Sequence, residues 1–216
     1  MSKTDFHVPE GYPENYKSVE KTTTAFLRDR GSKFYAYCIP VANKAAVEAA
    51  LADLAKEHPK ARHICYAYRL GLFPIKERAN DDGEPQGTAG VPILMHMQGA
   101  GITFCLIAVV RYFGGTLLGK GGLVNAYGGC AKEALTKQKI LTFPTKVAAS
   151  LQFGFEAYNT FMEVFSQTKY NEQVQLKDQD FDNICKISLE VNLAVMHAFL
   201  GEIQQKIALI DLKHEI

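Results

Sequence analysis

The sequence predicts an α+β protein of two domains, residues 1–144 and residues 145–216. Strand-like and helix-like patterns alternate along the chain, which gives the mixed content. The tripeptide Phe143-Pro144-Thr145 interrupts that alternation and marks the boundary. The charge also changes sign there, because residues 1–145 carry 18 basic and 13 acidic side chains, whereas residues 146–216 carry 6 and 10. The first domain is therefore the better candidate to hold an anionic ligand.

The first domain is predicted to start with a polar arm over residues 1–20. Residues 32–40 are rich in aromatic side chains and end at a proline, which predicts a strand. Asn43 is expected to cap a helix over residues 44–58, which is rich in alanine. Residues 63–70 alternate and are rich in tyrosine, and they predict a second strand.

Residues 71–101 contain too many Gly and Pro residues for a long element, so we expect a long loop with a short helix at residues 92–97. Residues 102–113 form an apolar run that predicts a buried strand, and residues 123–138 predict a helix entered through glycines.

The second domain has a compact pattern that predicts the order βαββαβ, the ferredoxin-like arrangement. The expected elements are a strand at 148–155, a helix at 157–168, strands at 171–177 and 183–191, a helix at 194–206 and a strand at 208–214.

Composition places the chain among ordinary globular proteins, with 47% hydrophobic and 22% charged residues and a net charge of +1. The five cysteines are odd in number and include no CxxC pair, which predicts reduced thiols in a cytosolic protein. We expect no signal peptide and no membrane span, because the first residues are polar and no apolar window reaches about 18 residues.

Twelve of the 17 glycines lie between Gly83 and Gly129, in and around two unusual strings. The first glycine string, residues 80–90, reads NDDGEPQGTAG, and the second, residues 111–122, reads RYFGGTLLGKGG. Glycine costs backbone entropy, so its clustering indicates positive φ angles or a close approach of the backbone to another molecule. Acidic, basic and aromatic residues lie among these glycines, which is typical of a recognition surface.

The second string has most of the spacing of a phosphate-binding loop, but Gly121 stands where a Ser or Thr would hold magnesium. Weaker phosphate binding by backbone N–H groups and Lys120 stays open, as does a glycine hinge without a ligand. In the first string, Asp81, Asp82 and Glu84 could bind magnesium or act as acids and bases. We favour a structural role, in which one of these acids pairs with Arg111 or Arg69 and fixes the loop.

Two other chemistries are conceivable. His63 and Cys65 share a face of the predicted strand and could form a thiolate pair, although a cysteine in a strand is more often a small core residue. Cations and aromatics could also form a nucleic-acid surface, with the alternative that the aromatics are core and the cations solvated. The residues concerned are Arg62, His63, Tyr66, Tyr68, Arg69, Arg111, Tyr112, Phe113 and Lys120.

Two motifs in these strings resemble those of the IMPACT/YigZ family. They are DDGEPxGTAG at residues 81–90 and VRYFGGxxLGxGGLV at residues 110–124, and the resemblance covers roughly residues 15–140. It implies a two-layer α/β first domain with a left-handed βαβ crossover, as in the second domain of ribosomal protein S-five and domain IV of elongation factor G. It also implies a ferredoxin-like second domain similar to domain V of that factor.

The resemblance further implies a role in translation. Eukaryotic members of the family act as translational regulators in amino-acid starvation and carry an extra partner-binding domain, so we do not expect their kinase-linked role here. The family usually has Arg or Lys after the GGLV run, where this chain has Asn125, and Lys120 could replace that cation one turn away. The motif residues carried over are Asp81, Asp82, Glu84, Thr88, Arg111, Tyr112, Gly114, Gly115, Gly119, Gly121 and Gly122.

We therefore expect a cytoplasmic, translation-associated binding protein that contacts the ribosome, RNA or a translation-factor partner, with no catalytic residue, cofactor, metal or membrane. The alternatives are an enzyme for a small phosphorylated or peptide substrate and a protein–protein interaction module. Asp81, Asp82 and Glu84 are expected to hold the loop, Arg111 and Lys120 to contact the anion, and Tyr112 and Phe113 to stack or pack. The expected anion- or nucleic-acid-binding residues are Arg69, Arg111, Tyr112, Phe113, Gly114, Gly115, Gly119, Lys120, Gly121 and Gly122.

Overall fold

The computed structural model describes residues 8–215 and divides the chain into two compact units. The N-terminal unit is Tyr16–Phe143, and the C-terminal unit comprises Pro144 onward together with the described residues before Tyr16. Val8 and Tyr12 pack against the core of the C-terminal unit. Residues 8–15 therefore group with that unit, whereas the sequence placed them in the first domain. Residues 1–7 of the predicted arm lie outside the described residues, and residues 15–19 of it form strand β1 (Asn15–Val19).

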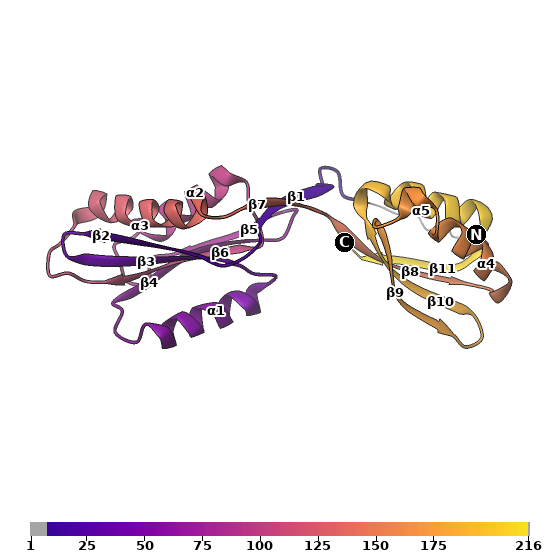
Figure 1. The fold of residues 1–216 in the computed structure, drawn as a ribbon, viewed down its shortest axis with the longest axis horizontal. Helices are drawn as coiled ribbons and strands as arrows, with labels where there is room; N and C mark the ends of the chain where they lie inside the picture. Colours follow the sequence, from indigo (N-terminus) through magenta and orange to yellow (C-terminus); the bar gives the residue numbers. More distant parts are fainter. Residues whose placement is uncertain (1–7, 216) are drawn as a thin grey trace. The chain divides into compact units, whose positions relative to one another are not determined.

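A five-stranded sheet forms the centre of the N-terminal unit (Figure 1). Every neighbouring pair in it is antiparallel. The middle strand is buried on both faces because its sequence is a continuous apolar run. The order across the sheet is β2 (Thr23–Asp29), β3 (Ser32–Pro40), β6 (Cys105–Tyr112), β4 (His63–Leu70) and β5 (Lys76–Asn80).

Helices pack on both faces of this sheet, which corrects the two-layer expectation to three layers (Figure 1). Helix α1 (Lys44–Glu57) packs on one face, where Val47 meets Leu70 and Leu106. Helices α2 (Gly90–Ala100) and α3 (Gly119–Thr136) pack together on the other face, over the larger core. The predicted cap of α1 is confirmed, because the Asn43 side chain accepts a hydrogen bond from the backbone N–H of Ala46 at 2.9 Å.

The prediction of a long loop at residues 71–101 is wrong. This segment contains β5, a polar edge strand paired with β4, and α2, which is longer than the short helix expected at residues 92–97. Two further strands, β2 and β7 (Ile140–Pro144), were not expected, and β7 pairs with β1. Helix α3 also begins four residues before the predicted start, so the last glycines of the second string lie in its first turn.

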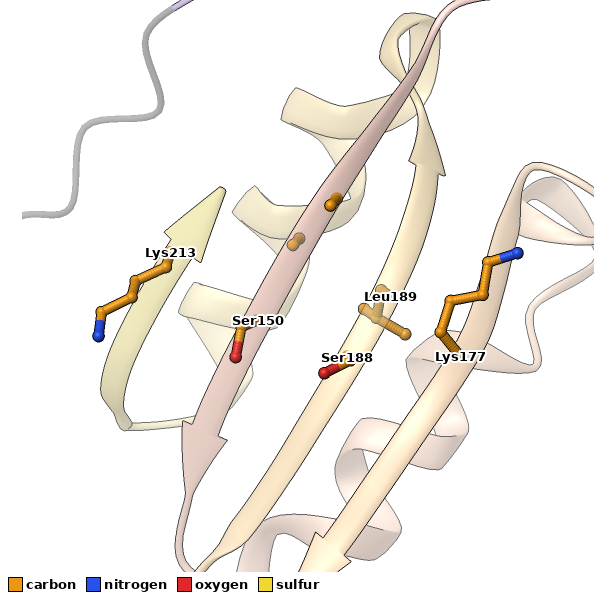
Figure 2. A pocket seen from close by; sticks show the side chains of 7 residues that line it. Ser150, Lys177, Ser188, Leu189 and Lys213 are labelled. Carbon is orange, nitrogen blue, oxygen red and sulfur yellow. The ribbon is translucent and has the colours of Figure 1, made fainter. Parts of the chain in front are cut away.

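The C-terminal unit has the predicted order βαββαβ. Its antiparallel sheet has the strand order β11-β8-β10-β9, and its helices cover one face (Figure 1). The other face is open and carries a shallow hollow of about 300 Å³, around which Ser150, Lys177, Ser188 and Lys213 stand (Figure 2). The elements are β8 (Lys146–Phe153), α4 (Tyr158–Phe165), β9 (Val174–Phe181), β10 (Cys185–Asn192), α5 (Leu193–Lys206) and β11 (Leu209–Glu215).

Candidate functional site

The carboxylate of Asp81 ties the first glycine string to the start of helix α2. It accepts hydrogen bonds from the backbone N–H groups of Gly87, Ala89 and Gly90 at 2.8, 3.0 and 2.8 Å. Partial burial raises the pKa of Asp81, but the three backbone N–H groups lower it more, so its pKa lies below the ordinary value. Asp81 thus supplies the cap that α2 lacks locally, since its N-cap residue Ala89 has no side-chain acceptor.

Asp82 joins the same string to strand β4. Its carboxylate accepts a hydrogen bond from the backbone N–H of Ile64 at 2.6 Å, and its carbonyl oxygen lies 2.6 Å from His63 Nδ1. Its backbone has a φ of 43°, which is in the left-handed region that an aspartate tolerates better than most residues. The string is therefore fixed both to the sheet and to α2.

Glu84 and Arg111 form a buried ion pair under the two strings. Arg111 Nη1 donates to Glu84 Oε1 at 2.5 Å, and the side chains are only 6% and 4% exposed. The Tyr127 hydroxyl of α3 donates to the same oxygen at 2.7 Å, and His63 Nε2 lies 3.8 Å away. The pairing of one acid with Arg111 was the favoured structural alternative, and it joins the first string, β6 and α3.

This burial corrects the expected roles of the two arginines. Arg111 is directed into the layer between the sheet and α3, where it contacts the rings of Phe34 and Phe113, and it does not reach solvent to bind an anion. Arg69 is also buried, and it donates to Glu77 at 2.8 Å and to the carbonyl of Ile102 at 2.6 Å. Both guanidinium groups hold the structure together.

Close approach of two backbone segments explains Gly114, the first glycine of the second string. A Cβ on Gly114 would lie 1.9 Å from the carbonyl carbon of Gly31 and 2.1 Å from the nitrogen of Ser32, so only glycine fits. The Ser32 hydroxyl accepts a hydrogen bond from the Gly114 N–H at 3.2 Å. Gly115 and Gly119 instead have positive φ angles, of 86° and 72°.

The second string exposes a short loop between β6 and α3. Phe113 is 50% exposed and Leu117 is 82% exposed, while Lys120 is exposed in the first turn of α3. Among the described residues, Lys120 forms no ion pair. Gly121 and Gly122 follow it in that turn, and anion binding there stays a prediction.

The Tyr112 side chain is directed to the opposite face of the sheet from Arg111. Its hydroxyl lies 2.8 Å from Nδ1 of His58, the residue that ends α1. Tyr66 and Tyr68 are on that face as well, packed against α1, so these two aromatics belong to a core rather than to a free surface. The set of cations and aromatics expected to form one surface is therefore divided between the two faces of the sheet.

The thiolate and metal alternatives gain no support from the geometry. Cys65 is fully buried and donates to the carbonyl of Asp81 at 3.0 Å, whereas His63 contacts Asp82 instead. Burial is the largest cause of the raised pKa of Cys65, and nearby acids add to it. Over the part of the chain that the structure describes, no group of three or more His, Cys, Asp or Glu side chains could hold a metal ion. No described helix is long and apolar enough to span a bilayer.

Three members of the site were missed at the level of sequence. Tyr127 and Ser32 complete the buried network, and His58 holds Tyr112. Tyr127 carried a detectable signal, because it is an aromatic residue in a predicted helix that is otherwise rich in Gly and Ala. Ser32 and His58 come from segments distant in sequence and carry no local signal.

Comparisons with known proteins find several similar chains. A family model described as the Impact N-terminal domain matches residues 30–135, a range that contains both glycine strings. A protein of Haemophilus influenzae named IMPACT family member is 33% identical over 191 residues, which cover 87% of this chain and 91% of that protein. IMPACT family member YigZ of Escherichia coli is 47% identical over 92 residues, which are 42% of this chain and 45% of that protein. A crystal structure of a hypothetical protein covers 94% of this chain and 97% of its own, with 26% identity and a TM-score of 0.69.

Proposed function

This chain belongs to the IMPACT family, and from that premise we propose that it is a translation-associated binding protein that contacts RNA of the translation machinery in the cytoplasm. The proposal extends to the fold names implied by the family resemblance: a first domain related to domain IV of elongation factor G, and a ferredoxin-like second domain. The strand order β11-β8-β10-β9 of the C-terminal sheet supports the second of these names.

The exposed loop of the second glycine string is the observation that carries the proposal. A buried network of Glu84, Arg111 and Tyr127 fixes its base, and the loop presents Phe113, Leu117 and Lys120 outward. A surface fixed in this way binds at a small conformational entropy cost, because its backbone is ordered before the partner arrives.

The titratable groups beneath the loop favour binding over catalysis. Glu84 is buried against Arg111 and the Cys65 thiol is fully buried, so a substrate cannot reach either of them without displacing the strings. An enzyme would need such groups to line an accessible cavity.

Ribosome co-sedimentation of the intact chain at low salt tests the proposal. Leu117→Ala combined with Lys120→Ala should weaken association about tenfold, a value that corresponds to about 1.4 kcal/mol. The variant removes one exposed cation, Lys120, whereas Arg111 is buried and makes no phosphate contact. At most one phosphate contact is therefore lost, and the dependence of log K on log salt should become less steep by about 0.9 or less.

Met95→Ala combined with Lys132→Ala provides the control. Met95 is 63% exposed on α2 and Lys132 is exposed on α3, so the control removes the same kinds of side chain from the same helical layer. Association that is absent for the intact chain, or that falls equally in the two double variants, would contradict the proposed function.

A further inference from the structure

We propose that the half of the N-terminal sheet left open beside α1 binds single-stranded RNA by stacking bases on its aromatic side chains. This inference rests on the proposed function and names the surface and the kind of RNA. The surface, called here the open half-sheet, consists of the α1-side positions of β2 and β3 with three neighbours. Its members are Thr24, Phe26, Arg28, Lys33, Tyr35, Tyr37, His58, Tyr112 and Phe113.

Helix α1 leaves this half of the face uncovered. The small core beneath α1 draws its sheet residues mainly from β4 and the far ends of β3 and β6, such as Tyr66, Leu70 and Leu106. Phe26, on the edge strand β2, is not part of either core and is 49% exposed. Tyr35, Tyr37 and Tyr112 are half-buried beside it, and Phe113 is 50% exposed. A partly exposed aromatic cluster beside a covered one indicates a binding surface.

The aromatic rings contact one another, partly edge to face, and the cluster is called here the platform. The ring centroids of Phe26 and Tyr35 are 4.9 Å apart, and that of Tyr35 lies 5.9 Å from Tyr112 and 5.7 Å from His58. Hollows of about 400 and 240 Å³ share Tyr35 in their walls, and the smaller one reaches Phe113. Successive bases can occupy such hollows and stack on the rings, because every base offers a π face.

His58 holds the platform in a fixed arrangement. Its Nε2 lies 2.6 Å from the Tyr37 hydroxyl, and its Nδ1 lies 2.8 Å from the Tyr112 hydroxyl. Both ring nitrogens are therefore occupied, and two of the tyrosine rings are oriented before any ligand binds. A platform ordered in advance loses little side-chain entropy on binding.

Free cations beside the platform favour a polyanion as the occupant. Arg28 and Lys33 are partners across β2 and β3, and neither forms an ion pair within the described part of the chain. The larger hollow is also lined by the acid Glu57 and by Lys137, which pairs with Glu133 at 3.2 Å. Cations next to stacking rings match the alternation of phosphates and bases along a single strand.

The open face of the C-terminal sheet provides the contrast. Its lysines are exposed too, but each of those near the hollow in Figure 2 is neutralised by an acid: Lys177 pairs with Glu190 at 3.2 Å and Lys213 with Asp211 at 3.3 Å. Its hollow is lined by Ala, Ser, Lys and Leu and has no aromatic ring. The open half-sheet of the N-terminal unit therefore combines stacking rings with free charge, and the C-terminal face does not.

Fluorescence anisotropy of the intact chain with a labelled ten-nucleotide oligouridine tests this inference. Phe26→Ala should weaken binding about tenfold, because stacking on one aromatic ring accounts for about that factor or more. Arg28→Ala combined with Lys33→Ala should reduce the salt slope by about 1.4, the value expected for two phosphate contacts on a single strand. An RNA duplex of the same length should bind more weakly, since its bases are already stacked.

Phe155→Ala is the matched control, because Phe155 is 48% exposed in the C-terminal unit. Equal weakening by Phe26→Ala and Phe155→Ala, tighter binding of the duplex, or an unchanged affinity of the Phe26→Ala variant would overturn the inference. A dimer in solution that Phe26→Ala dissociates would instead assign the face to a second copy of the chain, and it would overturn the inference too.

The two proposals can fail separately. Leu117→Ala with Lys120→Ala changes the loop on the α3 side of the sheet, so this variant should bind oligouridine like the intact chain. Ribosome association that is lost with that loop but unaffected by Phe26→Ala would leave the proposed function standing and remove the open half-sheet from it.

Discussion

The Glu84→Gln substitution should destabilise the N-terminal unit severely while preserving the shape of the side chain. Glu84 is 4% exposed and accepts hydrogen bonds from Arg111 and Tyr127, so the variant leaves a guanidinium group buried at 6% exposure without its counter-charge. Removing one partner of a buried pair costs about 3–5 kcal/mol. We therefore expect the free energy of unfolding of this unit to fall by about 3 kcal/mol or more.

Glu77→Gln gives the comparison within the same sheet. Glu77 pairs with Arg69 at 2.8 Å but is 29% exposed, so water can replace part of the lost contact. The buried Arg69 also keeps its hydrogen bond to the carbonyl of Ile102, which compensates for part of the lost charge. We expect that variant to lose about 1 kcal/mol or less. Combining Glu84→Gln with Arg111→Met removes both buried charges, and the double variant should regain part of the loss because no uncompensated charge remains.

Urea unfolding followed by far-ultraviolet circular dichroism measures these differences, since the chain has no tryptophan for a fluorescence signal. Two transitions are expected for the two units, and only one should move. Hydrogen exchange of the β6 amides assigns that transition to the N-terminal unit. A loss below 1 kcal/mol for Glu84→Gln, or one equal to that of Glu77→Gln, would refute the role given to the buried pair.

Three further results follow from the structure. Folding depresses the pKa of Asp81, so the stability that its carboxylate contributes is present above about pH 4 and is lost as the pH falls through the folded pKa. Asp81→Asn should therefore lower the free energy of unfolding by about 2 kcal/mol at pH 7, and it should flatten the acid side of a curve of stability against pH. Gly114→Ala should destabilise the protein by about 3 kcal/mol, because its Cβ would overlap with the backbone of Gly31 and Ser32. Gly121→Ala should stabilise it by about 0.5 kcal/mol, because a Cβ there meets open space. Thermal unfolding compares the two variants, and equal effects would contradict the geometry. Burial raises the pKa of the Cys65 thiol, and that of Cys130 to about 12, so iodoacetamide at pH 8 should modify neither before unfolding, as mass spectrometry would show.

Local patterns in the sequence were sufficient for several elements. The cap at Asn43 and the alternation in β3 and β4 act within a few residues, so the strands and α1 could be predicted with their bounds nearly correct. The order of the C-terminal unit could also be predicted, because each of its elements has its own apolar pattern and turn residues.

Long-range contacts determine the elements that the sequence did not reveal. Strand β5 is a polar pentapeptide with no alternation, and it becomes a strand because β4 supplies its hydrogen-bond partners. Helix α2 begins where the Asp81 carboxylate accepts its first N–H groups, eight and nine residues along the chain. The burial of Arg111 depends on Glu84, Ser32 and Tyr127, which come from three other segments.

Crosslinking of the intact chain to a 4-thiouridine-labelled single-stranded RNA, followed by peptide mass spectrometry, tests the central claim most directly. The account predicts crosslinks on the peptides that carry Phe26, Tyr35 and Tyr37, with fewer in the Phe26→Ala variant. Crosslinks confined to residues 146–215, or a pattern that the variant does not change, would contradict it.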